Sequence, residues 1–410
     1  YFCIMKRLKD FFITMCMVVF ASLTTNAETQ PQNSQDGLVD SDSITISLLT
    51  CSPGSEVWSL YGHTAIRLQD PAHEMDLAIN YGMFNFHQKN FVLRFVFGLT
   101  DYEMGIEPFQ TFLQEYAHSG RGVLEQRLNL THEEKIAIAS ALYRNYEPSN
   151  RTYRYNYFYD NCTTRARDII TGNLNGHVEY TNTLYDSSYR KMIHQWNAQH
   201  RWARFGNDLL LGIKADAHVD QAQQQFLPDT LRKDFATAVI INSAGNRRPL
   251  VDSTFEILKP VSANAHTETD IWDTLSPRIV FSLFGVIVVL FSLSEWKRRK
   301  PYWLTDTIIL TLDGLAGLIL LAMVFSEHPT VSLNLQILLL NPLFIIFAYL
   351  SIKQRFKDRC HWCWKLQLGF IILFFLGNIF QNYAEGMNIL ALTLMVRCIL
   401  NIRALSANTK

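Results

Sequence analysis

The chain has 410 residues, and its 37 lysines and arginines balance its 37 aspartates and glutamates, so the formal net charge is zero. A neutral chain creates no overall positive field, and we expect no nucleic-acid partner. The average composition hides two regimes. The sequence up to about residue 275 mixes polar and apolar residues as soluble domains do, whereas long apolar runs dominate the remainder. The first part is long enough to bury a substantial core.

The start of the chain has the composition of an export signal. A basic run at residues 5–9 is followed by an apolar stretch at 11–23 and by small residues at 25–27. This order predicts a secretory signal peptide over residues 1–27, cleaved after Ala27. An uncleaved anchor helix is the alternative, although the apolar stretch is short for a bilayer. The following region, residues 28–275, is therefore predicted to be exported.

The exported region predicts a mixture of strands and helices. Alternating apolar residues at 44–50 indicate a strand, and 61–68 and 76–81 are two more strand candidates joined by a turn at Asp70-Pro71. Thr131 and Glu134 form a capping-box pattern that begins a helix ending near residue 145. Residues 153–159 are aromatic and extended, residues 162–170 predict a helix, and residues 185–245 are expected to be mostly helical. The fold class is therefore α+β.

Two side chains of this region have the context of a nucleophile and its base. Cys162 follows Asn161, a favourable N-cap residue, and would lie in the first helical turn, where backbone amides and the helix dipole favour the thiolate. His63 lies on a predicted strand directly after Gly62. A strand-borne imidazole facing a thiol at a helix start is the arrangement of papain-like enzymes. Here His63 precedes Cys162, which is a circular permutation of the usual order.

A third polar group is expected to orient the imidazole or to stabilise an oxyanion. Asn80 and Tyr81 are in reach if their strand pairs with that of His63. They have structural alternatives, a solvated strand end for Asn80 and a core position for Tyr81. Asn161 is a further candidate beside the nucleophile.

The cysteines leave one alternative open. Of seven cysteines, only Cys51 and Cys162 fall in the exported region, where they could form a disulfide. That bond would leave no nucleophile and would favour a non-enzymatic envelope scaffold. Cys360 and Cys363 have metal-like spacing but no second pair, so we expect no metal site and no cofactor.

Residues 276–410 predict a membrane domain. Five apolar stretches approach the length that a bilayer requires, at about residues 278–294, 305–326, 334–352, 366–383 and 387–405. Lysines and arginines follow the first and third stretches, whereas the loops at 326–333 and 382–386 contain none. The basic loops and the C-terminus are thus expected in the cytoplasm. Five crossings of a bacterial inner membrane then place residues 28–275 on its periplasmic side, which is also where a signal peptide directs them.

Polar residues interrupt these apolar stretches and the loops between them. Asp313 and Arg397 fall within predicted spans and could form an ion pair. His328 and Asn334 lie at the predicted outer membrane face, where they are candidates for a lipid access route or simply members of a solvated loop. Asn341, within the predicted third span, is a further candidate for lipid access. Two aspartates of the exported region, at 208 and 216, are expected to be structural.

Several strings together resemble a known family. They are Tyr61 to Arg67, Asn80 to Phe84, Tyr153 to Arg165, Phe205 to Gly212, Phe226 to Pro228, Glu327 to Pro329 and Leu339 to Pro342. This pattern resembles the Lnb-type lipoprotein N-acyltransferases of Bacteroides and relatives, and it covers nearly the whole mature chain. The resemblance implies a permuted papain-like periplasmic domain followed by a five-helix transmembrane bundle. It also implies transfer of a fatty acyl chain to the N-terminal cysteine amine of a diacylglyceryl lipoprotein, with Cys162 as nucleophile and His63 as base.

Three function classes therefore remain. The first is acyl transfer, with membrane phospholipid as the donor, a diacylglyceryl lipoprotein as the acceptor and the lipid bilayer as the surroundings. The second is a membrane-anchored cysteine peptidase or amidase that acts on peptidoglycan. It needs the same thiol and imidazole but no membrane spans. The third is the scaffold that a Cys51–Cys162 disulfide would favour.

Overall fold

The computed structural model describes residues 43–84, 91–181, 186–261, 275–298, 303–354 and 361–406. The predicted signal peptide and Cys360 lie outside these residues. The chain forms two compact units. Among the described residues, the first unit contains those up to 95, those within 99–186 and those within 219–265, and the second contains 96–98, 187–218 and those from 266 onward.

This division differs from the expected boundary at residue 275, because residues 187–218 belong to the second unit. The segment contains α6 (Tyr189–Trp196), α7 (Arg201–Leu210) and the 3-10 turn η2 (Ile213–Asp216). Helix α7 packs Phe205, Leu209 and Leu210 against the apolar core of the C-terminal helices. The composition of the segment is that of a soluble region, and only the position of its apolar residues on one helix face reveals the contact.

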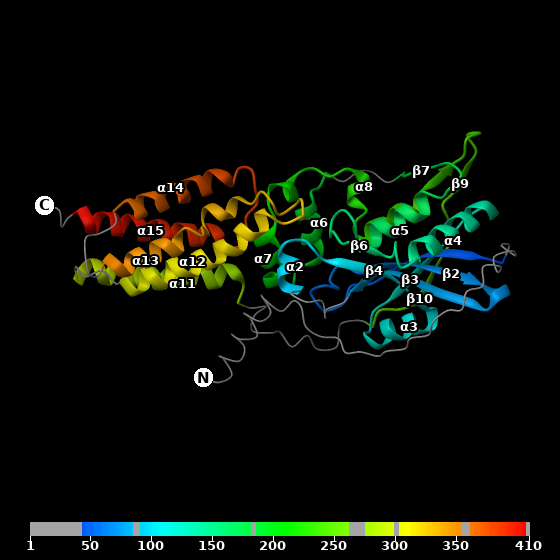
Figure 1. Cartoon of the computed structure of the whole chain (residues 1–410), viewed down its shortest axis with the longest axis horizontal. Helices are drawn as coiled ribbons and strands as arrows, with labels where there is room; N and C mark the ends of the chain where they lie inside the picture. The colour runs from blue at the N-terminus through cyan, green and yellow to red at the C-terminus, as the bar shows by residue number, and fades with distance from the viewer. Residues whose placement is uncertain are drawn as a thin grey trace. The chain divides into compact units, whose positions relative to one another are not determined.

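A seven-stranded antiparallel sheet forms the framework of the first unit (Figure 1), in the order β10-β5-β1-β2-β3-β4-β6. The strands are β1 (Thr45–Cys51), β2 (His63–Asp70), β3 (Met75–Phe84), β4 (Asp101–Pro108), β5 (Val123–Leu128), β6 (Thr152–Arg154) and β10 (Val251–Leu258). The first three confirm the predicted strands, and η1 (Pro71–His73) lies at the predicted turn. Strand β6 covers only the start of the stretch expected to be extended.

Helices cover both faces of this sheet (Figure 1). On one face, α3 (Phe109–His118) packs its aromatic residues against small and aliphatic side chains of β1, β2 and β3. On the other, α4 (His132–Tyr146), α5 (Cys162–Thr171) and α9 (Pro228–Thr237) bury a larger cluster. Helix α4 begins with the predicted capping box of Thr131 and Glu134, and α5 confirms the helix expected from residue 162.

The remaining elements of the first unit are short. A three-stranded sheet contains β7 (His177–Glu179), β8 (Val239–Ile241) and β9 (Arg247–Pro249). Strand β8 lies within the region expected to be mostly helical, which otherwise contains α6, α7, α8 (Gln221–Gln224) and α9. Helix α2 (Phe91–Val96) links β3 to β4.

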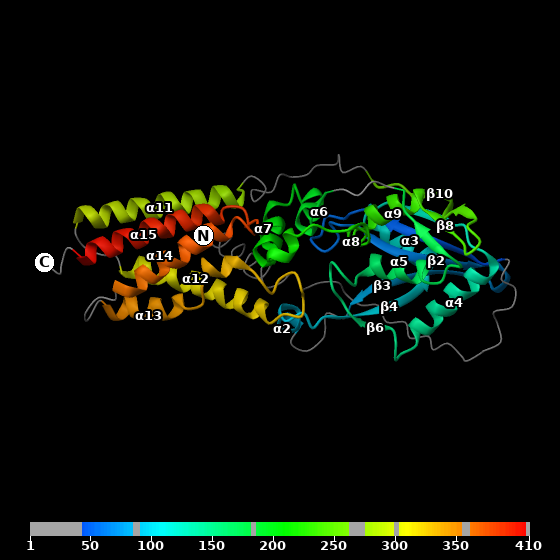
Figure 2. The same ribbon diagram turned by 90° about the horizontal axis from the view of Figure 1, so that it is seen from above.

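The second unit contains the apolar helices of the C-terminal half, which run side by side in two views (Figures 1 and 2). They are α11 (Pro277–Arg298), α12 (Trp303–Val324), α13 (Phe344–Gln354), α14 (His361–Gly377) and α15 (Met387–Ser406). Helices α11 and α12 are each long and apolar enough to cross a bilayer, and α14 is a shorter apolar helix. The stretch 334–352 is not one continuous helix: the 3-10 turn η3 (Leu335–Leu338) precedes α13. Pro342 interrupts it, because proline lacks an amide hydrogen and disfavours helical backbone at Asn341.

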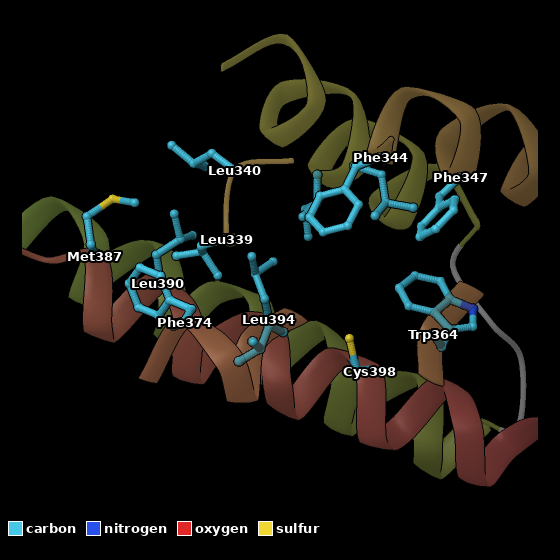
Figure 3. Close-up of a cluster of buried hydrophobic side chains, with 14 of the residues drawn as sticks. Leu339, Leu340, Phe344, Phe347, Trp364, Phe374, Met387, Leu390, Leu394 and Cys398 are labelled. Atoms are coloured by element: carbon cyan, nitrogen blue, oxygen red, sulfur yellow. The ribbon is translucent and has the colours of Figure 1, made fainter. Parts of the chain in front are cut away.

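The helix bundle has apolar residues both inside and outside. Leu390, Leu394 and Cys398 of α15 face Leu339 and Phe374 in a buried cluster (Figure 3). Large apolar side chains are also exposed along α11 and α12, including Leu283, Leu290 and Leu312, each more than half exposed. Soluble surfaces rarely carry so many exposed apolar groups, so this exterior suits a lipid environment.

A buried ion-pair network joins three of these helices, and it differs from the expected Asp313–Arg397 pair. Arg397 on α15 donates hydrogen bonds to Glu295 on α11 and to Asp306 on α12. Asn401, one helical turn beyond Arg397, also donates to Asp306. The pair with Asp313 was expected because Asp313 and Arg397 both fall within predicted spans. The carboxylate that Arg397 contacts is instead Asp306, about two helical turns before Asp313.

Candidate active site

Helix α5 begins at Cys162 because Asn161 caps its first turn. The Asn161 carboxamide oxygen accepts hydrogen bonds from the amides of Thr163 and Thr164, at 2.8 and 2.9 Å. Its amide group donates to the carbonyls of Tyr157 and Phe226. Both donors are thus occupied, so the residue is a structural cap rather than the oxyanion donor that we considered from the sequence.

The Cys162 thiol lies beside the His63 imidazole. Burial alone would raise the pKa of the thiol, but the charge of His63, a hydrogen bond with its ring and the backbone amide of Thr64 lower the pKa to about 7. Burial likewise opposes the charged imidazole, but the Cys162 thiolate and hydrogen bonds with Cys162 and Asn80 raise the pKa of His63 above its ordinary value. The two shifts favour a thiolate–imidazolium pair near neutral pH.

Two glycines leave room for the His63 imidazole beside the Cys162 thiol. Gly62 has φ +79°, and a Cβ there would lie 2.6 Å from the carbonyl oxygen of Cys51. A Cβ on Gly82 would lie 2.9 Å from the His63 ring. Larger residues at either position would displace β2 or the ring, so both glycines are needed for the geometry of His63. The close backbone approach at Gly62 was predicted from the sequence, and that at Gly82 was not.

Asn80 on β3 is bonded to the far side of the imidazole. Its side-chain oxygen lies 2.8 Å from His63 Nε2 and also accepts from the Gly82 amide, which identifies the oxygen as the acceptor. Nε2 therefore carries the hydrogen, and Nδ1 is left to face the thiol. Tyr81, the other candidate, is fully buried in the core against Tyr153 and does not share this position. Successive strand residues point to opposite faces, which separates the two.

A buried pair of threonines, which was not predicted from the sequence, links the strand of His63 to the helix of Cys162. The hydroxyl oxygens of Thr64 and Thr163 lie 3.1 Å apart, and both residues are fully buried. The Thr163 hydroxyl is also 3.8 Å from Cys162 Sγ. Each threonine is the chain neighbour of a catalytic candidate, and that adjacency was the only available signal.

Cys51 and Cys162 are both free thiols. Cys51 is buried on β1, directly opposite His63 in the strand ladder. Burial raises the pKa of its thiol to about 12, despite a hydrogen bond with Tyr116. The disulfide on which the scaffold alternative depended is absent between these two residues, and only Cys162 has the surroundings of a nucleophile.

The candidates for lipid access lie in the second unit and differ in exposure. Asn334 is 3% exposed, and its amide donates to the Leu209 carbonyl. Its side-chain oxygen accepts from Gln336 and Gln381. Asn341 is also buried and caps the turn before α13 through the Leu343 amide. These two asparagines therefore have structural partners, whereas His328 is partly exposed.

Comparison with known proteins gives two matches that together cover most of the chain. The family model described as the Lnb N-terminal periplasmic domain matches residues 31–195, which include His63, Asn80 and Cys162. The model described as the Lnb transmembrane domain matches residues 267–408. No curated protein and no solved structure matches the chain. The chain therefore belongs to the Lnb family, with a periplasmic N-terminal domain followed by a transmembrane domain.

Proposed function

We propose that this protein is a lipoprotein N-acyltransferase that uses Cys162 as a covalent nucleophile. The observation that carries the proposal is the thiol of Cys162 beside the imidazole of His63, whose far nitrogen is held by Asn80. Cys162 is thus a nucleophile, His63 its base and Asn80 the group that orients the base, and each is hydrogen-bonded to the next. Acyl transfer through a thioester requires such an arrangement. The order of the two residues, His63 before Cys162, supports our proposal that the domain is a permuted relative of papain-like enzymes.

In the first half-reaction, the thiolate attacks the ester carbonyl of a membrane phospholipid. A carbon–sulfur bond forms, and the carbon–oxygen bond breaks. The departing alkoxide takes a proton from the His63 imidazolium and leaves as lysophospholipid. The backbone amide of Cys162, in the first turn of α5, is our candidate donor to the transient oxyanion.

In the second half-reaction, the N-terminal amine of a diacylglyceryl lipoprotein attacks the thioester. A carbon–nitrogen bond forms, and the carbon–sulfur bond breaks. Neutral His63 accepts the proton of the attacking amine, and the thiolate is restored. Because the imidazole gives a proton in one step and accepts one in the other, its pKa has to lie near the working pH, as the raised pKa of His63 favours.

Peptidoglycan hydrolysis would need the same catalytic pair. The membrane domain is the feature that favours acyl transfer over hydrolysis. Both substrates of acyl transfer are held in a bilayer, and full removal of an acyl chain into water costs about 0.8 kcal/mol per methylene. A periplasmic catalytic domain fused to a transmembrane domain keeps the reaction at the membrane. A cell-wall hydrolase gains nothing from that fusion.

The test uses the full-length protein in phospholipid micelles with a synthetic diacylglyceryl peptide. We expect a hydroxylamine-sensitive acyl group on Cys162 and an N-acylated peptide product, both detected by mass spectrometry. Cys162→Ser should give neither, while keeping the thermal unfolding midpoint of the native protein. Cleavage of purified peptidoglycan without any acyl-enzyme would overturn the proposal in favour of the hydrolase.

A further inference from the structure

A cluster of aromatic rings lies at the border of the first unit's apolar core. Its inner members, Tyr81 and Tyr153, are buried, with their ring centroids 6.4 Å apart. The Tyr102 ring lies 6.3 Å from the Tyr153 ring, and Phe84 and Tyr155 contact Tyr102 at 4.6 and 4.1 Å between centroids. Phe84, Tyr102 and Tyr155, which we call the outer aromatic cluster, are only partly buried. Part of their apolar surface is therefore open.

The backbone fixes these three rings from three parts of the chain. Phe84 is the last residue of β3 and lies directly opposite Tyr102 of β4 in the strand ladder. Tyr155 lies between β6 and α5, and its amide donates to the Thr100 carbonyl at 3.0 Å, just before β4 begins. Because strand pairing and this hydrogen bond hold the backbone, the rings form a surface that exists before any substrate binds.

The nucleophile borders on the same part of the core. Cys162, Tyr102 and Tyr155 are all partly buried and pack against one cluster of apolar side chains. Burial raises the pKa of Tyr102 and of Tyr155, and the charge of the Cys162 thiolate raises both further. The two phenols are therefore uncharged near neutral pH, and they present apolar ring surface close to the thiol.

The proposed thioester needs such a surface. It attaches the carbonyl carbon of a fatty acyl group to Cys162 Sγ, so the first methylenes of the chain must lie beside the thiol. Methylenes left in water would oppose formation of the thioester, because each one gains free energy when an apolar surface covers it. The described residues of the first unit offer the partly open rings of the outer aromatic cluster for this contact.

We propose that the outer aromatic cluster is the surface on which the acyl chain lies while the chain is bound to Cys162. Its rings have no charge to select a headgroup or a peptide, and they favour a saturated chain by contact area alone. The inference rests on the proposed acyl transfer and adds the residues that recognise the transferred group.

The experiment measures how thioester formation depends on chain length. Full-length protein in neutral detergent micelles is mixed with the p-nitrophenyl esters of acetate, butanoate, hexanoate or octanoate. The Cys162 thiolate attacks the ester carbonyl, a carbon–sulfur bond forms, the carbon–oxygen bond breaks, and p-nitrophenolate leaves with the electron pair. Its absorbance gives the rate constant of acylation. Esters enter the micelles equally for every protein, so variants are compared at each chain length.

Two variants open the outer aromatic cluster, and one is a control. Tyr102→Ser removes the central ring, and Phe84→Ser removes a ring at the end of β3, so that the test stands if one of them folds poorly. Tyr143→Ser is the control, because this tyrosine is 62% exposed on α4 and is not part of the cluster. The acetate ester has no chain to contact the rings and serves as the reference in each protein.

In the native protein and the control, the rate constant should rise by up to about fourfold for each added methylene. In Tyr102→Ser and Phe84→Ser this rise should largely disappear, while the rate with the acetate ester stays within about twofold of the native value. A rise that persists in both variants, or an equal slowing with all esters, overturns the inference, because the rings would then have no contact with the chain or only a structural role.

The outcome also separates this inference from the proposed function. If the esters acylate Cys162 with the expected dependence on chain length but phospholipid does not, the proposed donor is wrong and the acyl-chain surface is supported. If no ester acylates Cys162 in the native protein, the thioester mechanism is wrong, and this inference is overturned with it.

Discussion

The hydroxyl oxygens of Thr64 and Thr163 lie 3.1 Å apart in the buried interior and connect strand β2 to helix α5 beside the candidate catalytic pair. Thr64 adds its backbone amide, and Thr163 its hydroxyl, to the surroundings of the Cys162 thiol. The pair thus sets the distance between the elements that carry His63 and Cys162, and it supplies donors that favour the thiolate.

Thr163→Val should therefore raise the pKa of the Cys162 thiol, and so lower the fraction present as thiolate, without removing the nucleophile. A single hydrogen bond contributes about 0.5–1.5 kcal/mol, so alkylation of Cys162 by iodoacetamide at pH 7 should slow roughly 2- to 10-fold. Thr163→Ser keeps the hydroxyl and should react as the native protein does. Equal rates for valine and serine variants would show that the hydroxyl does not act on the thiol.

The pH dependence of Cys162 alkylation should show whether His63 lowers the pKa of the thiol. The pKa of the thiol is lowered to about 7, so reactivity should rise as the pH increases through 7, where the thiol loses its proton. His63→Ala removes the neighbouring positive charge, and the rise should then occur at higher pH. An unchanged midpoint of the pH profile in the alanine variant would mean that His63 is not paired with Cys162.

Asn80→Ala should lower the rate of acyl transfer while preserving the fold. The amide oxygen fixes the His63 ring through Nε2, and the bond strengthens when the ring is charged. Hydrogen bonds to charged groups contribute about 1.5–3 kcal/mol, so kcat should fall roughly 10- to 100-fold. Tyr81→Phe, which changes only a buried hydroxyl next along the strand, is the matched control and should keep kcat within about twofold.

Cys51→Ala should retain activity. Cys51 is buried opposite His63 but has a thiol pKa of about 12, so it contributes no nucleophile near neutral pH. We expect kcat within about twofold of the native value and a loss of stability of about 1 kcal/mol from the small cavity, seen by thermal unfolding. An inactive but folded Cys51→Ala protein would require a role for a second thiol.

Arg397→Met should strongly destabilise the helix bundle. Removal of the guanidinium leaves Glu295 and Asp306 buried without their cation, and breaking a buried pair in this way costs about 3–5 kcal/mol. The unfolding midpoint in detergent should fall by several degrees. Asp313→Asn, which touches neither carboxylate, should have a much smaller effect, and a reversed order would support the Asp313–Arg397 pair that was expected from the sequence.

Local patterns in the sequence determined much of the framework. The first three strands, the capped helix at Thr131 and the helix that begins at Cys162 were all predictable, because period-two alternation and N-cap residues act over a few neighbouring positions. Local patterns of the same kind predicted that Cys162 lies at the start of a helix and that His63 follows a glycine on a strand. The apolar stretches likewise indicated a membrane domain, to which a family model now assigns residues 267–408.

Only the tertiary structure decided which groups meet. The choice of Asn80 over Tyr81 depends on which face of β3 lies toward His63, and a one-residue change of register would exchange them. The partners of Arg397 depend on how three helices are rotated against one another, which periodicity within each helix does not determine. Residues 187–218 have the composition of a soluble region, yet the apolar face of α7 packs on the membrane helices, because burial depends on the available partner surface as well as on composition.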